Sequence, residues 1–174
     1  MSNYRRAAVP GATYFFTVHL ADRRSRMLVE HVDALRAAHA ATLLDHPVRI
    51  DAMVVLPDHL HAVWRLPEGD ADFPTRWRKL KARFSRAVGG TYPRSASKIR
   101  KGELGLWQRR YWEHRIRDAQ DWRRHVAYCW SDPVRHGLAR SARDWPHSSF
   151  HREVRRGLAP ADWAGEVRGG AFGE

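Results

Sequence analysis

Cysteine is almost absent from this sequence, which has a single cysteine, Cys129, among 174 residues. One cysteine cannot form an internal disulfide, and it excludes a zinc site built from four cysteines. Long hydrophobic runs are also lacking: no apolar stretch reaches the roughly 18 residues of a transmembrane helix. The first residues are polar and basic rather than the apolar segment of a signal peptide, so a cytoplasmic protein is expected.

Acidic residues are few compared with basic ones. The chain has 31 Lys and Arg against 19 Asp and Glu, which gives a net charge of +12. Lysine itself is scarce, so most of this charge is arginine, whose planar guanidinium binds phosphate with two hydrogen bonds. Genomic base composition can explain the ratio of arginine to lysine, but it does not explain the net excess of positive charge. A polyanionic partner is therefore expected, most often nucleic acid.

The length suits one domain with a proper core. We expect a catalytic domain over residues 1–150 and a partly disordered tail over 151–174. Apolar periodicity predicts the following elements. They are a strand over 14–20, a helix over 28–44, strands over 48–56 and 59–66, a helix over 73–88, a mobile loop over 91–105, a short strand at 106–107, a short helix over 109–117, and a helix over 119–130 that Pro133 ends. This order predicts an α+β fold with a ferredoxin-like antiparallel sheet and helices on one face, followed by a helical or irregular basic C-terminal part.

Two histidines one residue apart, His59 and His61, are the sharpest local signal. Residues two apart on a strand point to the same face, so both imidazoles project together while Leu60 enters the core. Such a pair can share one divalent ion and leave room for a third ligand, water or phosphate oxygens. That arrangement suits a metal that polarises a scissile phosphate. The alternative is a pair of histidines on a half-exposed strand without a metal, because the motif alone is weak.

A candidate nucleophile follows in the segment Gln-Arg-Arg-Tyr-Trp-Glu-His. If residues 109–117 are helical, Tyr111 and His114 share a face. A tyrosine hydroxyl can attack phosphorus, but its free pKa of about 10 means that it needs a cation, base or metal nearby. Arg109, Arg110 and His114 could supply positive charge, and His114 is the candidate third metal ligand. The alternative is a boundary aromatic followed by a surface histidine.

Basic residues recur at offsets of three and four along the helix expected over 73–88. They are Arg76, Lys79, Arg83 and Arg86. This stripe is interpreted as a phosphate-binding surface, and a solvated helix face is the alternative. Arg23 and Arg24 form a further candidate patch, and Arg109 and Arg110 complete the expected DNA-binding set.

Several stretches occur together in an order known from one protein family. They are Arg5-Arg6 with 10–18, Leu-Pro-Asp-His-Leu-His at 56–61, 66–73, Arg76-Trp77, Trp-Gln-Arg-Arg-Tyr-Trp-Glu-His at 107–114, 116–118, and Pro-Val-Arg-His-Gly-Leu at 133–138. Over roughly residues 4–150 the chain resembles the REP-associated tyrosine transposases, a branch of the single-tyrosine HUH transposases. The chain departs from the family pattern at Asp132, where an asparagine is common, and at the preceding Cys129-Trp130-Ser131.

The resemblance implies a fold, a metal and a chemistry. The fold is a ferredoxin-like α+β core, and the cofactor is Mg or Mn held by the pair His59 and His61. The substrate is single-stranded DNA of repeated extragenic palindromes (REPs), which folds into hairpins. Tyr111 matches the family's tyrosine, whose attack leaves a 5′-phosphotyrosine and a free 3′-hydroxyl that can reverse the reaction. A monomer or homodimer without membrane association is expected.

Two other functions are compatible with the same residues. One is a metal-dependent hydrolase that uses His59, His61 and His114 with water as the nucleophile. The other is a palindrome-binding protein without chemistry, which would survive the loss of both histidines of the pair.

Overall fold

The centre of the molecule is an antiparallel four-stranded sheet. The structure is a computed structural model that describes residues 8–89, 94–102, 104–165 and 172–173. Within these residues the strands are β1 (Thr13–His19), β2 (Arg49–Val55), β3 (His59–Arg65) and β4 (Trp112–Arg115), in the spatial order β2-β3-β1-β4. With a helical segment after β1 and another after β3, this is the β-α-β-β-α-β order of ferredoxin-like domains. The α+β prediction is confirmed.

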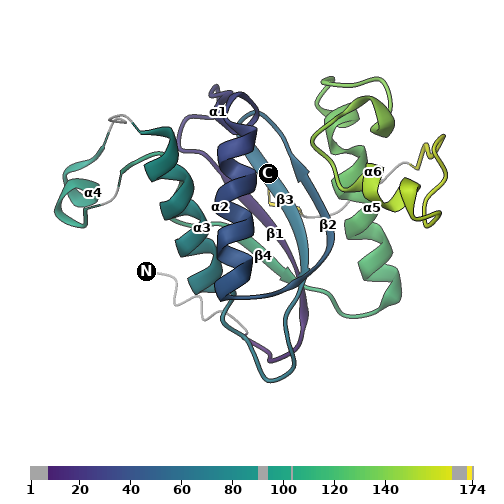
Figure 1. The fold of residues 1–174 in the computed structure, drawn as a ribbon, viewed down its shortest axis with the longest axis horizontal. Helices are drawn as coiled ribbons and strands as arrows, with labels where there is room; N and C mark the ends of the chain where they lie inside the picture. The colour runs from purple at the N-terminus through teal and green to yellow at the C-terminus, as the bar shows by residue number, and fades with distance from the viewer. Residues whose placement is uncertain (1–7, 90–93, 103, 166–171, 174) are drawn as a thin grey trace.

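Helices cover both faces of this sheet rather than one (Figure 1). The helices are α1 (Met27–Glu30), α2 (Val32–Asp45), α3 (Phe73–Val88), α4 (Ala96–Arg100), α5 (Ala119–Arg135) and α6 (Phe150–Arg155). The first face, here called the α2/α3 face, packs against α2 and α3, as the sequence predicts. The second face, the α5 face, packs against α5, which belongs to the C-terminal part of the chain.

Alternation along the strands divides the core between the two faces. Tyr14 and Phe16 of β1 point to the α2/α3 face, where Trp64 of β3 stacks on Trp77 of α3 with ring centroids 4.1 Å apart. Phe15 points to the opposite cluster on the α5 face. Whether a residue occupies an odd or an even position along its strand therefore decides on which face of the sheet its side chain lies.

The helix predicted over 109–117 is wrong, because this segment contains the edge strand β4. β4 pairs antiparallel with β1, with Thr17 opposite Trp112 and Phe15 opposite His114. Aromatic residues suit a pleated surface, and β1 offers an otherwise unpaired edge to bond. The strand alternation then sends Tyr111 to the α2/α3 face and Trp112 to the α5 face.

The helix expected to end near Trp130 continues through Pro133 to Arg135. A proline inside a helix loses one backbone hydrogen bond. The disruption is tolerated because the helix ends only two residues later, where the His136 N–H bonds to the Asp132 carbonyl. This continuation keeps Asp132 and His136 on one helix, which matters for the site below.

Other predicted elements are refined by the structure. The helix expected over 28–44 is divided at His31 into α1 and α2, and the loop expected over 91–105 contains α4, while residues 90–93 and 103 lie outside the described residues. The first part of the expected tail includes most of α6 and packs through Ala159 against Phe150. Residues 166–171 and 174 of that tail lie outside the described residues. Among the described residues, no helix combines the length and the apolar character needed to cross a membrane.

Candidate active site

His59 and His61 lie side by side on the α5 face, as the strand alternation predicts. Both side chains are buried, and their ring centroids are 5.0 Å apart. Leu60 between them points the opposite way into the core of the α2/α3 face. Both imidazoles therefore point from β3 toward α5.

Neighbouring side chains hold both imidazole rings from behind. Thr17 Oγ1 lies 2.9 Å from His61 Nδ1, and Asp58 Oδ1 lies 2.8 Å from His59 Nδ1. Hydrogen bonds at Nδ1 fix the ring orientation and leave Nε2 for a ligand, as in most metal-binding histidines. Arg23 bonds the same Asp58. Burial by itself raises the pKa of Asp58, but the interactions with His59 and Arg23 outweigh it and lower the pKa to about 2.

The carboxylate of Asp132 faces both Nε2 atoms from α5. Its Oδ2 lies 3.4 Å from His59 Nε2 and 3.1 Å from His61 Nε2, and its side chain is fully buried. Burial alone raises the pKa of Asp132, but hydrogen bonds with the two histidines hold this pKa well below its usual range. Burial also lowers the pKa of His59, yet the two neighbouring carboxylates, Asp132 and Asp58, raise it overall. Imidazoles and carboxylates therefore stabilise one another's charged forms at His59, Asp58 and Asp132.

This cluster fits a divalent metal ion. His59, Asp132 and His136 each offer a ligand atom, and these atoms all lie within 4.8 Å of one another. His136 Nε2 is 3.6 Å from the second oxygen of Asp132. Imidazole nitrogens with one carboxylate are common ligands of Mn and related ions. Asp132 keeps the oxygen donor of the asparagine that the family pattern has there, and its negative charge adds attraction for a cation.

A tyrosine that sequence reasoning missed, Tyr128, lies beside the histidine pair. It is fully buried one helical turn before Asp132, and its ring centroid is 5.2 Å from that of His61. The Arg135 guanidinium sits 4.7 Å from the centre of the Tyr128 ring. The ring of Phe172, near the C-terminus, stacks on Tyr128 with centroids 3.7 Å apart. An aromatic hydroxyl is therefore placed on the same face of the sheet as the candidate metal ligands.

Tyr111 lies on the opposite face of the sheet. Its ring packs against Phe16 and Trp77, with centroids 6.0 Å from each, in the core next to α3. His61 points to the α5 face. The structure therefore does not bring Tyr111 together with the histidine pair.

His114 belongs to a second group of potential ligands. It sits opposite Phe15 on β4, so the whole of β1 separates it from β3, a distance of roughly 10 Å between strand axes. Its Nε2 is 2.8 Å from Asp121 Oδ2, and its ring stacks on His125 with centroids 4.6 Å apart. His114 therefore does not reach the histidine pair, and the potential ligands beside His59 are Asp132 and His136.

The basic stripe predicted on α3 is largely used within the protein. Arg76 is 1% exposed, and its guanidinium bonds both carboxylate oxygens of Asp70 and the carbonyls of His46, Pro47 and Asp72. It is thus unavailable to DNA.

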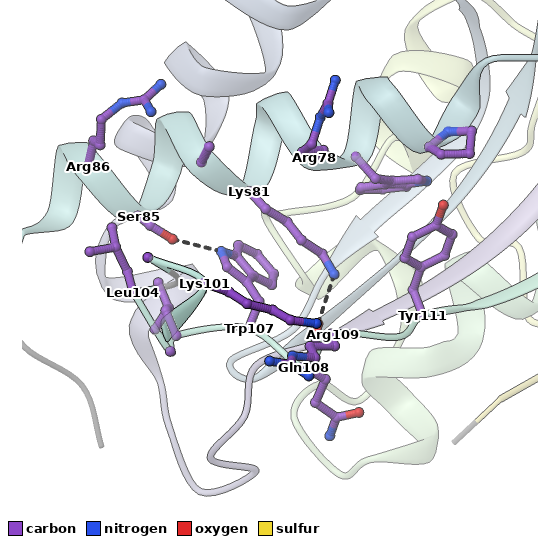
Figure 2. A pocket seen from close by; sticks show the side chains of 16 residues that line it. Arg78, Lys81, Ser85, Arg86, Lys101, Leu104, Trp107, Gln108, Arg109 and Tyr111 are labelled. Carbon is purple, nitrogen blue, oxygen red and sulfur yellow. Dashed lines mark hydrogen bonds between the residues drawn. The ribbon is translucent and has the colours of Figure 1, made fainter. Parts of the chain in front are cut away.

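The other candidate DNA contacts have mixed positions. Arg83 and Lys79 both pair with Asp45 of α2. Arg24 and Arg110 are exposed, and Arg86 and Arg109 line a pocket beside α3 (Figure 2). Arg23 is half-exposed and bound to Asp58, as described above.

Comparison with known proteins assigns the chain to a family, although no family model matches it. A REP-associated tyrosine transposase of Escherichia coli is 46% identical over 174 residues, covering 100% of this chain and 98% of the relative. A putative REP-associated tyrosine transposase of Haemophilus influenzae is 40% identical over 170 residues, covering 95% and 94%. The chain belongs to the REP-associated tyrosine transposases. A solved structure of such a transposase bound to a REP hairpin is 46% identical, with a TM-score of 0.89 over 100% of this chain and 98% of that one.

The candidate site residues of this transposase that the sequence interpretation missed share one pattern. Tyr128, Asp132 and His136 follow one another at intervals of four, which places them on one side of a helix. The spacing was available in the sequence, but interpreting Pro133 as the end of the helix separated His136 from the other two. A helix that tolerates proline in its last turn restores the pattern.

Proposed function

We propose that this REP-associated tyrosine transposase cuts and rejoins single-stranded, hairpin-forming DNA with Tyr128 as the nucleophile. The observation that carries the proposal is the position of Tyr128 beside His61 and one turn from Asp132. Tyr111, the tyrosine expected from the sequence, is on the far side of the sheet. A nucleophile has to share a site with the group that activates the phosphate, because the reacting atoms must come within about 3 Å of each other.

Two observations support hairpin DNA as the substrate. The net charge of +12 favours a polyanion. The relative of known structure, 46% identical over the whole chain, is bound to a REP hairpin. DNA that has to meet a buried tyrosine must offer a phosphate outside a stacked duplex, which agrees with a single-stranded segment next to the hairpin.

A divalent ion would be held by the Nε2 atoms of His59 and His61 together with the Asp132 carboxylate, and His136 would offer a further ligand atom. When bound, such an ion supplies the positive charge that polarises a scissile phosphate. The chain's own contribution is to keep the ligands in place. Thr17 and Asp58 fix the two rings through their Nδ1 atoms. The low pKa of Asp132 keeps its carboxylate ionised at neutral pH.

Tyr128 would form and break the covalent bond. Its oxygen attacks phosphorus and gives up the phenolic proton, while the bond from phosphorus to the 3′ oxygen breaks and that oxygen takes up a proton. The products are a 5′-phosphotyrosine and a free 3′-hydroxyl, and attack by such a hydroxyl reverses the step. The guanidinium of Arg135 over the Tyr128 ring favours the phenolate electrostatically. Because the Phe172 ring covers Tyr128, the DNA has to displace this ring to reach the hydroxyl.

The test is a gel assay for a covalent adduct. A hairpin oligonucleotide from the host's repeats, with single-stranded flanks and a label at its 3′ end, is incubated with protein and Mg or Mn. We expect the label to move with wild-type protein and with the control Tyr111→Phe, but not with Tyr128→Phe or after chelation.

Two results would contradict this mechanism. Cleavage without an adduct would favour water as the nucleophile, and the protein would then be a hydrolase. Hairpin binding without cleavage in either metal, across several repeat sequences, would favour a binding protein without chemistry.

A further inference from the structure

A pocket of about 770 Å³ opens on the α2/α3 face, away from the histidine pair. One side of α3 forms one wall, and described residues of 101–102 and 104–111 form the other (Figure 2). The volume lies in the range of small-molecule sites and is large enough for a nucleotide. Tyr111 closes one end of the pocket, directly before the edge strand β4 begins.

The lining of this pocket is strongly cationic. Five basic side chains contribute to it: Arg78, Lys81, Arg86, Lys101 and Arg109. No acidic side chain is among the described residues that line it. Of the four basic residues predicted to form a stripe on α3, Arg86 lines this pocket, and the other cations of α3 that line it are Arg78 and Lys81. Arg76 instead bonds Asp70 and backbone carbonyls within the protein. An anion entering the pocket would meet a concentrated positive field.

Aromatic rings stand among these cations. The Lys81 ammonium lies 5.7 Å from the centre of the Trp107 ring and 5.2 Å from that of Tyr111, and it donates to the Gln108 carbonyl over 3.0 Å (Figure 2). The Trp107 indole N–H is fixed by a 3.1 Å hydrogen bond to Ser85 Oγ. The Trp107 ring is therefore held in place before any ligand arrives.

We propose that this pocket binds an unpaired nucleotide of the DNA strand, with the phosphate on the cations and the base against the rings of Trp107 or Tyr111. The proposal rests on the proposed function, because it assumes a single-stranded DNA substrate. Fixed aromatic rings within a positively charged groove are how proteins hold single strands. Bases in a duplex stack on each other, so only an unpaired base offers its face to a protein ring.

The position of the pocket connects it to the active site around the edge of the sheet. Tyr111 precedes Trp112, whose partner in the neighbouring strand is Thr17, and Thr17 contacts His61. β4 is the edge strand, so a DNA strand can pass around it from one face to the other. A nucleotide held in the pocket would fix the path of the strand relative to Tyr128 and thereby help to select the phosphate that is cut.

The experiment measures DNA binding with chemistry switched off. Every protein carries Tyr128→Phe, and no divalent metal is added. One fluorescent probe is a hairpin with single-stranded extensions at both ends, and the other is the same hairpin with blunt ends. Lys81→Ala is compared with Lys79→Ala, which removes an equal charge from the same helix outside the pocket. Arg78→Ala is a second pocket variant, and because Arg78 is exposed this variant is expected to fold normally.

We expect Lys81→Ala to weaken binding of the extended hairpin about tenfold and that of the blunt hairpin less than about twofold. Arg78→Ala should shift binding in the same direction, and Lys79→Ala should change neither affinity. The proposal is overturned if both pocket variants bind the extended hairpin as tightly as Lys79→Ala, or if blunt-hairpin binding falls equally. Failure of the parent protein to bind either DNA would overturn the proposed function as well, so the two failures are distinguishable.

Discussion

The two faces of the sheet use opposite kinds of electrostatics. On the α5 face, the buried histidines His59 and His61 lie 3.4 and 3.1 Å from the buried carboxylate of Asp132, and Tyr128 lies beside them. On the α2/α3 face, the pocket beside α3 collects cations and aromatic rings, with no acid among its described lining residues. The first arrangement suits a metal and a chemical step, and the second suits holding an anionic strand. We therefore propose catalysis for the α5 face and binding of the DNA strand for the α2/α3 face.

Strand parity causes this division. On β3, His61 points to the α5 face and its neighbour Ala62 to the α2/α3 face. At the start of β4, Trp112 points to the α5 face and its neighbour Tyr111 to the α2/α3 face. One-residue steps decide which side chains meet, because successive residues of a strand point to opposite faces. Histidines and a tyrosine that occur in one sequence therefore need not lie in one site.

The largest expected effect is a loss of DNA cleavage, with little loss of DNA binding, when a histidine of the α5 face is removed. His61→Ala removes an imidazole of the α5 face and should lower the rate of adduct formation roughly a thousandfold, because charge stabilisation at the phosphate is lost. Hairpin affinity should change less than about threefold, since binding is spread over many cations. Adduct formation on the gel and fluorescence anisotropy measure the two quantities. Near-normal cleavage by this variant would contradict the assignment of catalysis to the α5 face.

A second prediction concerns two arginines two residues apart on α3. Arg76→Ala should lower the free energy of unfolding by about 3 kcal/mol, because it removes the buried guanidinium that bonds the Asp70 carboxylate and three backbone carbonyls. Arg78→Ala should change it by less than about 0.5 kcal/mol, since Arg78 is exposed. Urea denaturation of both variants makes the comparison. Equal stability of the two variants would contradict the structural role of Arg76.

A third prediction sharpens the description of the α5 face. Thr17→Val removes the hydroxyl that holds His61 Nδ1 and should weaken Mn binding by about 10- to 100-fold, as loss of a partner behind a metal ligand does. Thr17→Ser keeps the hydroxyl and should bind Mn as the wild type does. Titration calorimetry with Mn checks both. Unchanged Mn affinity in the valine variant would show that Thr17 does not orient the ligand.

The smallest effect is a pH dependence on the α2/α3 face. Burial of His39 beside Trp64 lowers its pKa from 6.5 to about 4. Between these values the unfolded chain binds a proton that the folded protein does not, so stability should fall as the pH drops from 6.5 to 4. His39→Leu should remove roughly 2 kcal/mol of that loss. Denaturant melts at pH 7 and pH 4 test this, and identical pH profiles of variant and wild type would exclude it.

Much of the fold follows from local sequence signals. The bounds of α3 were predicted from its apolar stripe, and β1, β2 and β3 were predicted to within about one residue at each end. Strand alternation alone predicts that the side chains of His59 and His61 point to the same face of the sheet. These features depend on neighbours in sequence, and the physical rules that govern them are local.

The features that were not predicted depend on distant parts of the chain. β4 is a strand because β1, far away in sequence, offers an edge to pair with. Arg76 is buried because the carbonyls of His46 and Pro47 come to it from the end of α2. The sequence indicates His114 as a third metal ligand, whereas Asp132 comes close to the two histidines only because α5 folds back over the sheet. No local pattern contains these contacts.

The measurement that tests the central claim most directly is identification of the tyrosine that carries the DNA. The covalent adduct is formed with hairpin DNA and Mg or Mn, trimmed with nuclease and digested with trypsin, and the modified peptide is identified by mass spectrometry. We predict the nucleotide on the peptide 125–135, whose one tyrosine is Tyr128. A nucleotide on the peptide 111–115, which contains Tyr111, would contradict the proposed active site.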